Sequence, residues 1–396
     1  QKLMKIAFLT SGGNAPCLNS SMGRLLHSFG ELNKNVHAIG YLNGFSGLLK
    51  GKSIKLPTQE VKPFYRIGGS LIGNSRVKLT NIEDCIKKKL ITEGQVPLEV
   101  AANQLIEDEI DILFTIGGDD TNTTARDLQN YINSKDVNIT VIGIPKTIDN
   151  DIFPVKRSLG AYTAASEGAK FFKNIVSENF MGEHHLIVHE IMGRNSGWLT
   201  AYTAREYLGN KITFDNYNSL NSFFDSNRFD IHGLYVPERA VDIKNEIKRL
   251  SKVLKEVGCL NLFICEGAFL SNIKEDARKK GNIIEKDAFG HEKLDSVNAA
   301  KWFSSLISKE LDFDRILIQK SGYFARSASP NTEDLNYIFK LCDFAFKNAL
   351  ESNSGVVGED ERTGNLSCID FNDIKGDKGL DITSDWFLDI IESIEK

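Results

Sequence analysis

Short apolar runs alternate with amphipathic stretches along most of this chain, and this alternation constrains the fold more than any other feature. The apolar runs resemble buried strands, and the stretches between them carry apolar residues at helical spacing. Strands that alternate with helices build βαβ units around parallel sheets. The expected strands are 5–9, 36–40, 111–118, 138–145, 185–193, 259–267 and 313–322, and the expected helices are 20–32, 98–110, 159–180, 196–209, 246–258 and 333–352.

The alternation predicts an α/β fold with parallel sheets, and we expect two Rossmann-like domains with an active site in the cleft between them. A chain of 396 residues suits two domains. We expect one domain to contain residues 1–155 and about 324–375. The other is expected to contain residues 156–323 and a last amphipathic helix within about 380–396.

The composition argues against several classes of protein. The formal net charge is −5 and the basic residues are scattered, whereas a nucleic-acid binder normally has a basic face. No apolar run approaches the length of about 18 residues that would span a membrane. The six cysteines form no close pairs, which is typical of reduced thiols in a cytoplasmic protein.

Glycine-rich or charged clusters follow six of the expected strands. Because ligands of parallel sheets bind beyond the carboxyl ends of the strands, this recurrence predicts a ligand site more strongly than any single cluster does. The clusters are TSGGN (10–14), IGGDDTN (116–122), PKTIDND (145–151), MGRNSG (192–197), CEG (265–267) and KSGYFAR (320–326).

The cluster GGDDTN combines two glycines with two carboxylates. Glycines at a strand-to-helix turn expose backbone N–H groups to an anion. Asp119 follows directly and is well placed to hold Mg²⁺, which commonly binds few protein carboxylates together with substrate phosphates. Thr121 and Asn122 can cap the next helix, and capping alone is the alternative explanation. A cap requires only one such residue, so the cluster exceeds what capping needs.

The cluster PKTIDND places three ionisable side chains in a polar loop after a buried strand. Asp149 is our candidate for a general base, Lys146 for a residue that stabilises negative charge, and Asp151 for a residue that keeps the local field negative. The alternative is a solvated turn rich in Asp and Asn. Its position at the ligand edge of the sheet favours the functional interpretation.

Further basic and acidic residues follow other glycines or strand ends. Arg76, after the glycines of 68–73, suits a phosphate, as does Arg194 within MGRNSG. Glu266 could accept hydrogen bonds from sugar hydroxyls, and Tyr323 with Arg326 could hold another phosphate. Taken singly, each is more often part of an exposed ion pair.

With these clusters in this order, the chain resembles the phosphofructokinase family from about residue 4 to about residue 330. The motifs TSGG, GGDD, PKTIDND, MGR, CEG and GYFAR all occur in family order. The chain is most similar to the pyrophosphate-dependent branch. The resemblance implies reversible phosphoryl transfer from inorganic diphosphate to the 1-hydroxyl of fructose 6-phosphate, with Mg²⁺ as cofactor. It also implies a homo-oligomer, with a homodimer as the first expectation, and a first domain that binds the donor and a second that binds the sugar phosphate.

The resemblance implies a role for each matching residue. The residues expected to act in catalysis are Asp149, Lys146, Asp120, Arg194 and Thr147. Those expected to bind the donor are Gly12, Gly13, Arg76, Asp119, Asp120 and Asn122, with Asp119 also binding the metal. Those expected to bind the sugar phosphate are Thr147, Ile148, Asp149, Met192, Gly193, Arg194, Glu266, Lys320, Tyr323 and Arg326.

Two residues bear on the identity of the donor. The resemblance implies that relatives using ATP have glycine where this chain has Asp120 and Lys146. A carboxylate at 120 would intrude on the space and charge that the α-phosphate of a nucleotide needs. Lys146 would place positive charge beside the leaving phosphate. The two residues therefore favour diphosphate.

Three positions depart from the family pattern. Asn14 and Cys17 replace the usual Asp and Gly of the first loop, and His185 stands where a neighbouring subunit usually supplies an arginine. Protonated His185, or Lys320, would have to compensate. The alternatives are an ATP-dependent 6-phosphofructokinase, a distantly similar NAD or lipid kinase, and a non-catalytic regulatory subunit. The presence of Asp149 and Arg194 favours an enzyme.

Overall fold

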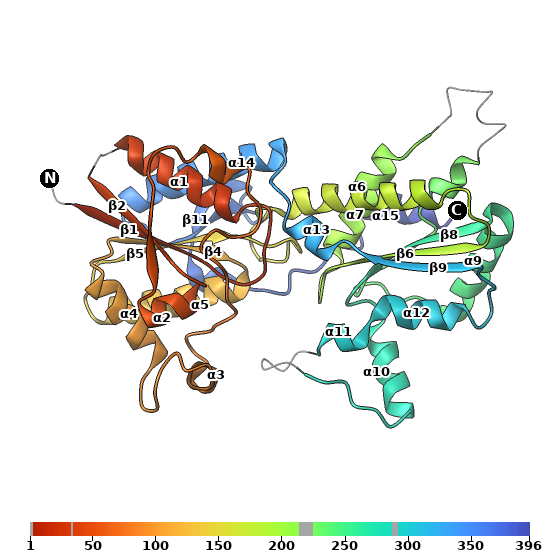
Figure 1. Cartoon of the computed structure of the whole chain (residues 1–396), viewed down its shortest axis with the longest axis horizontal. Helices are drawn as coiled ribbons and strands as arrows, with labels where there is room; N and C mark the ends of the chain where they lie inside the picture. The colour runs from red at the N-terminus through yellow and green to blue at the C-terminus, as the bar shows by residue number, and fades with distance from the viewer. Residues whose placement is uncertain (1–2, 33–34, 214–224, 287–291) are drawn as a thin grey trace. The chain divides into compact units, whose positions relative to one another are not determined.

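The computed structural model describes residues 3–32, 35–213, 225–286 and 292–396. It divides into two compact units, and Figure 1 labels their elements. Unit 1 comprises Gln1–Thr163 and Arg326–Lys378, and unit 2 comprises Ala164–Ala325 and Gly379–Lys396. The chain therefore passes between the units three times.

Unit 1 is built on a seven-stranded sheet with the order β11-β10-β5-β4-β1-β2-β3. The five inner strands are parallel, and the two edge strands, β3 and β11, pair antiparallel with their neighbours. β4 and β5 are buried along their whole length, as expected of strands covered on both faces. The strands are β1 (Met4–Thr10), β2 (Val36–Tyr41), β3 (Ser53–Leu56), β4 (Ile112–Gly117), β5 (Thr140–Pro145), β10 (Gly355–Asp360) and β11 (Asn365–Ile369).

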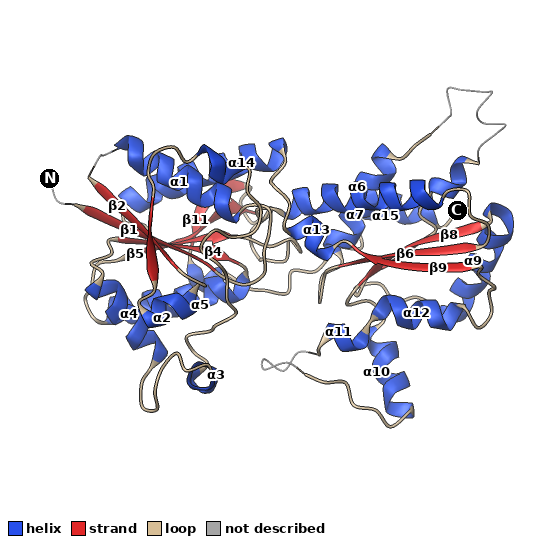
Figure 2. Cartoon of the chain, in the orientation of Figure 1, coloured by secondary structure: helices blue, strands red, loops and turns tan. Residues whose placement is uncertain are grey.

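Helices cover both faces of this sheet (Figure 2). α1 and α14 pack against each other on one face, and α2, α4 and α5 lie on the other. The helices are α1 (Leu18–Leu32), α2 (Phe45–Lys50), η1 (Lys62–Tyr65), α3 (Ile82–Lys87), α4 (Pro97–Glu107), α5 (Asp119–Ser134), α14 (Thr332–Leu350) and η3 (Phe371–Asp373).

Unit 2 contains a four-stranded parallel sheet with the order β7-β8-β6-β9. In Figure 1, α6, α7 and α15 lie on one side of the sheet, and α10, α11 and α12 lie on the other. The strands are β6 (His185–Ile191), β7 (Gly233–Tyr235), β8 (Cys259–Cys265) and β9 (Arg315–Lys320). The helices are α6 (Ala161–Asn179), α7 (Trp198–Asn210), η2 (Ser226–Phe229), α9 (Ile243–Val257), α10 (Leu270–Lys279), α11 (Leu294–Val297), α12 (Ala299–Ile307), α13 (Gly322–Arg326) and α15 (Asp385–Ile394).

Local sequence signals explain where helices begin and end. The side chain of Asp242 accepts a hydrogen bond of 3.0 Å from Asn245 N at the start of α9, and Gly258 ends that helix with φ 83°. The side chain of Asn331 accepts one of 2.8 Å from Asp334 N at the start of α14. Such caps satisfy N–H groups that the helix itself leaves without partners.

The predicted α/β class with parallel sheets is confirmed. Each predicted strand and helix corresponds to an observed element, including the last helix, which is α15. The prediction missed the strands β3, β7, β10 and β11, the helices α2, α3, α10, α11, α12 and α13, and the short helices η1, η2 and η3. No helix in the described ranges has the length and apolar content needed to cross a membrane.

Candidate active site

Loops at the carboxyl ends of three adjacent strands in unit 1 form a first cluster of candidate site residues. β1, β4 and β5 are neighbours in the sheet of unit 1, so the loops that follow them lie side by side. Backbone bonds join these loops: Ser11 N donates to Ile116 O at 3.0 Å, and Lys146 N donates to Gly117 O at 2.9 Å. The fold therefore brings TSGGN, GGDDTN and PKTIDND together.

The first glycine loop is held by the segment that carries Arg76. Gly12 has φ 81°, a conformation that side chains rarely allow, and its N–H donates to Ser75 O at 3.0 Å. Asn74 Nδ2 donates to Asn14 Oδ1 at 2.7 Å. Asn14 therefore joins the two loops. The Arg76 side chain is exposed, and a Cβ atom on Gly13 would lie 3.8 Å from its guanidinium.

The second glycine loop is shaped by side chains beneath it. A Cβ atom on Gly117 would lie 2.2 Å from Thr121 Oγ1, so only glycine fits there. Asn122 is fully buried, and its Nδ2 donates to the carbonyls of Gly117 at 3.2 Å and Gly118 at 2.8 Å. Asn122 fits there because Gly143 on β5 has no side chain: a Cβ atom on Gly143 would lie 2.3 Å from Asn122 Oδ1. The geometry favours a positioning role for Asn122 over the direct donor contact expected from the sequence.

The two aspartates after the glycines have different surroundings. Asp119 begins α5 and is partly buried; burial and the carboxylates of Asp120 and Asp151 raise its pKa to about 6. Asp120 is 63% exposed, and its Oδ1 lies 2.7 Å from Lys78 Nζ. Asp120 is therefore part of an ion pair, which the sequence did not suggest.

Lys146 is the most deeply buried cation of the cluster. Lys146 is only 5% exposed, and its Nζ donates a short hydrogen bond to Gly13 O. Burial lowers the pKa of Lys146 to about 8; Arg76 acts in the same direction, and the carboxylates of Asp151 and Asp149 oppose it. These four ionisable side chains thus lie within electrostatic range of one another.

The loop that carries Asp149 is held in place by hydrogen bonds at both ends. Asp149 N donates to Thr147 Oγ1 at 3.0 Å. Asn150 has φ 50°, and its Oδ1 accepts hydrogen bonds from Ser158 N at 2.9 Å and Ser158 Oγ at 2.8 Å. Asp151 O accepts from Lys378 N at 3.2 Å. The side chain of Ile148 is buried and anchors the loop, so the role that the structure shows for this residue is packing.

The carboxyl edge of the sheet in unit 2 carries a separate cluster of candidate site residues. Gly193 N donates to Glu266 Oε1 at 2.9 Å, and Gly267 N donates to Gly193 O at 3.1 Å. A Cβ atom on Gly267 would lie 1.9 Å from Arg194 O. The clusters MGRNSG and CEG are therefore interlocked, with Met192 and Arg194 partly exposed.

The ends of β6 and β9 carry a second ion pair. Lys320 Nζ lies 3.0 Å from Oε1 of Glu190, which is buried on the neighbouring strand. Tyr323 is 79% exposed on α13, and Arg326 ends that helix where the chain enters unit 1. Lys320 is therefore fixed at its ammonium group, whereas Tyr323 projects outward.

Two of the departures from the family pattern acquire a structural explanation. Cys17 is buried, its Sγ lies 3.5 Å from Leu159 O, and burial raises its pKa well above the ordinary value. His185 is also buried, its Nδ1 lies 2.9 Å from Gly182 O, and burial lowers its pKa. A buried, neutral histidine is a poor phosphate ligand, so the structure argues against the expected compensation by protonated His185.

Sequence reasoning missed Lys78 and Glu190. Lys78 follows Arg76 by two residues, which in an extended segment places both side chains on one face, so this spacing could have revealed it. Glu190 lies within a buried apolar strand, where a carboxylate is rare unless paired, and that context was the available signal.

Comparison with known proteins places the chain in a family. The phosphofructokinase family profile matches residues 5–216. A relative from Methylomonas methanica named pyrophosphate–fructose 6-phosphate 1-phosphotransferase is 46% identical over 399 residues, covering 99% of this chain and 97% of the relative. A relative of the same name from Mastigamoeba balamuthi is 44% identical, covering 98% of this chain and 95% of the relative. The chain therefore belongs to the phosphofructokinase family.

Solved structures agree on the fold. The pyrophosphate-dependent phosphofructokinase from Marinobacter aquaeolei superposes with a TM-score of 0.70 at 17% identity, covering 98% of this chain and 91% of its own. The corresponding protein from Nitrosospira multiformis also gives a TM-score of 0.70, at 16% identity. At such identities the likeness shows a common fold.

Proposed function

We propose that this enzyme reversibly transfers a phosphoryl group from inorganic diphosphate to the 1-hydroxyl of fructose 6-phosphate, giving fructose 1,6-bisphosphate and phosphate. One observation carries the proposal: relatives matched over nearly their whole length at 44–46% identity bear the name of this activity. An ATP-dependent 6-phosphofructokinase from Entamoeba histolytica is only 27% identical, over 360 residues.

Asp149 is the proposed base. It lies in the loop after β5, within electrostatic range of Lys146. Its backbone N–H donates a hydrogen bond to the side chain of Thr147. In the forward direction its carboxylate accepts the proton of the sugar's 1-hydroxyl as that oxygen attacks phosphorus. In the reverse direction the protonated carboxyl returns the proton to the leaving oxygen. The rigid loop fixes this carboxylate relative to the lysine.

Lys146 is proposed to stabilise the charge that develops on the donor. A buried ammonium acts in surroundings poor in water, where its field is stronger than in solvent. Because its Nζ donates to Gly13 O, the lysine also holds the first glycine loop in the conformation that would cradle a phosphate. Gly12 and Gly13 are the backbone part of that cradle, and exposed Arg76 supplies a further cation.

Asp119 is the proposed Mg²⁺ ligand. Its raised pKa reflects a partly buried carboxylate beside two others, and a divalent cation relieves this repulsion. Within the described ranges no group of three or more acidic, histidine or cysteine side chains is arranged to hold a metal. A single carboxylate suits Mg²⁺, which keeps waters and substrate phosphates as its other ligands. When bound, the ion would neutralise charge on the diphosphate.

Asp120 is proposed to select the donor. Its carboxylate is held by Lys78 beside the first turn of α5. Two side chains, Asp120 and Lys78, therefore fill the space beside this turn. A nucleotide would be excluded by their bulk as well as by the charge of Asp120. Lys78 offsets part of the negative charge that the sequence alone suggested at this position.

The sugar phosphate is proposed to bind at the edge of unit 2. One carboxylate oxygen of Glu266 accepts a hydrogen bond from Gly193 N, and this bond orients the carboxylate toward sugar hydroxyls. The cations proposed for the two ends of the substrate are Arg194 and Lys320. The remaining proposed contacts are Met192, Tyr323 and Arg326. On this assignment unit 1 is the donor-binding domain and unit 2 the sugar-phosphate-binding domain.

The assembly and location belong to the same proposal. A homodimer in the cytoplasm agrees with the family resemblance and with six cysteines that are all free thiols, five of them buried. Light scattering on the purified chain tests the dimer directly.

An activity panel on the purified chain tests the proposal. Diphosphate, with fructose 6-phosphate and Mg²⁺, should give turnover, and ATP in its place should not. Robust activity with ATP alone would identify an ATP-dependent enzyme. Sedoheptulose 7-phosphate in the same panel tests the breadth of acceptor use. The variant Asp149→Ala separates an enzyme from a regulatory subunit, because full activity in that variant would refute the assigned base.

A further inference from the structure

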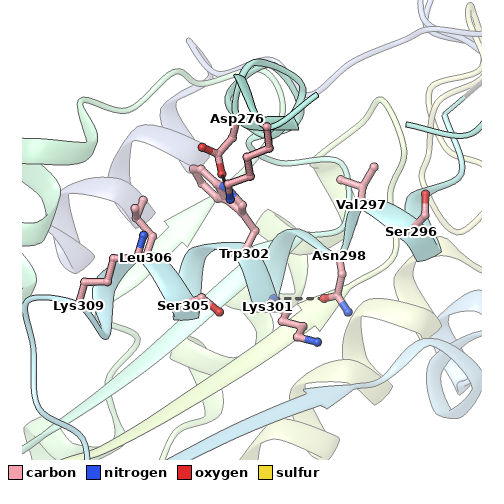
Figure 3. Close-up of a pocket in the computed structure, with 10 residues that line it drawn as sticks. Asp276, Ser296, Val297, Asn298, Lys301, Trp302, Ser305, Leu306 and Lys309 are labelled. Carbon is pink, nitrogen blue, oxygen red and sulfur yellow. Dashed lines mark hydrogen bonds and ion pairs between the residues drawn. The ribbon is translucent and has the colours of Figure 1, made fainter. Parts of the chain in front are cut away.

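A groove lies between α10 and α12 in unit 2, on the side of α12 that does not face the sheet. Its volume is about 430 Å³, within the range typical of small-molecule sites. Figure 3 shows the side chains that line it. They are Asp276, Lys280, Ser296, Val297, Asn298, Lys301, Trp302, Ser305, Leu306 and Lys309.

The lining has three lysines and one aspartate, and the aspartate is already engaged. Asp276 Oδ2 lies 3.1 Å from Lys280 Nζ and 3.3 Å from Trp302 Nε1, which donates to it. These bonds lower the pKa of Asp276. Within the described ranges Lys301 and Lys309 form no ion pair. The groove therefore presents two cations that form no ion pair with a described carboxylate, and Asp276 interacts with Lys309 only at longer range.

The two cations lie near the two ends of α12. Lys301 is in its first turn, and Lys309 lies two residues beyond Ile307, where the helix ends. In Figure 3 Lys309 lies at one end of the lining and Lys301 lies nearer its middle, with Asn298 and Ser296 toward the other end. An anion with two separated charged groups matches this spacing better than a single ion does.

Trp302 gives the groove an aromatic wall. Its indole N–H is bound to Asp276, and its ring packs against Phe269 with ring centroids 5.5 Å apart. A ring held at both its polar and apolar sides is fixed in orientation, and Val297 and Leu306 extend the apolar part of the lining. Such a wall suits the carbon skeleton of a metabolite.

The groove is separate from the proposed substrate site. α12 buries Ala299, Phe303 and Ile307 in the core of unit 2, and the groove uses the other side of the helix. None of the residues that line it belongs to the clusters at the carboxyl ends of the strands. A ligand here would bind without displacing the sugar phosphate.

We propose that this groove is a second anion-binding site, which takes a small metabolite carrying at least two carboxylate or phosphate groups on a short carbon skeleton. Lys301 and Lys309 bind the two charged ends, and Trp302 covers the skeleton between them.

Titration with tricarballylate, a tricarboxylate that lacks phosphate, tests the site in the full chain with fructose 6-phosphate at saturation. Calorimetry gives the Kd, and tryptophan fluorescence reports the groove because Trp302 is one of only three tryptophans. We expect saturable binding and a fluorescence change that the Trp302→Phe variant loses. Acetate, with one charge, should bind far more weakly.

Paired variants decide the outcome. Replacing Lys301 and Lys309 together with alanine should weaken binding at least about tenfold, since each charged hydrogen bond is worth roughly tenfold. The matched control replaces Lys248 and Lys255 on α9, which removes the same charge outside the groove and should leave Kd unchanged. Both pairs are exposed, so the fold should survive. Equal affinity in the two double variants, or no saturable binding, would overturn the proposal.

Discussion

Replacing Lys146 with methionine should abolish activity and yet stabilise the protein at neutral pH. The lysine is buried, and burial lowers its pKa from the ordinary 10.5 to about 8. A lowered lysine pKa means that the folded state binds the proton less tightly than the unfolded state does. The charged side chain therefore opposes folding at neutral pH, and methionine, of similar length, would remove this opposition.

The size and pH dependence follow from the same shift. One pKa unit corresponds to about 1.4 kcal/mol, so a shift of about 2.5 units opposes folding by about 3 kcal/mol below pH 8. Between about pH 8 and 10.5 the folded lysine is neutral while the unfolded lysine is still charged, and wild-type stability rises by about 1.4 kcal/mol per pH unit. In Lys146→Met the hydrogen bond to Gly13 O is lost, which offsets about 1–2 kcal/mol of the gain in stability. The stability of this variant lacks the pH dependence that the lysine causes.

Urea unfolding of both proteins at half-unit steps from pH 7 to 10.5 measures this difference. The stability advantage of Lys146→Met should be greatest below pH 8 and should shrink steadily above it. In parallel, wild-type kcat/KM for diphosphate should fall about tenfold per unit above pH 8 as the ammonium loses its proton. A stability difference that stays constant across this range would refute the assignment of a buried, charged lysine.

Four further variants test separate parts of the site. Asp149→Asn should lower kcat by about 10²–10⁴-fold in steady-state assays, with little change in KM for fructose 6-phosphate. Asp119→Asn should raise the Mg²⁺ concentration needed for half-maximal activity, measured at fixed diphosphate. Asp120→Gly should weaken diphosphate use and admit some ATP; an unchanged lack of ATP binding in calorimetry would show that occlusion is not the main barrier. Glu190→Gln should raise KM for fructose 6-phosphate about tenfold with kcat retained, because Lys320 loses its fixed partner, and Glu190→Asp should recover part of the loss.

The sequence predicted the sheet-forming elements well because their signals are local. Buried parallel strands such as β4 and β5 are continuous apolar runs, and each ends at glycine or proline. β10 was missed because its sequence, GVVGED, contains two glycines and two acidic residues. What makes it a strand is its pairing with β11 on one side and, on the other, with β5, a partner far away in the sequence.

The candidate site was predicted in outline, but its internal contacts were not. Motif order located the clusters around Asp119, Asp149 and Glu266, because strand ends are readable from the sequence. The engagement of Asp120 by Lys78 depends on how the segment after β3 folds back, and no local pattern specifies that. Burial of Asn122 likewise depends on the absence of a side chain at Gly143 on a different strand.

The pairing of β5 with β10 has a consequence for synthesis of the chain. β5 ends at Pro145, whereas β10 begins only at Gly355. At roughly 5–20 residues per second, the ribosome needs about 10–40 s to make the intervening roughly 200 residues. During that interval the growing chain can form β1, β2 and β4, but one backbone edge of β5 stays unpaired. An open strand edge is a template for aggregation. The strand that leads into the catalytic loop is therefore most vulnerable before the protein is finished, and a fragment ending at residue 163 would retain that weakness permanently.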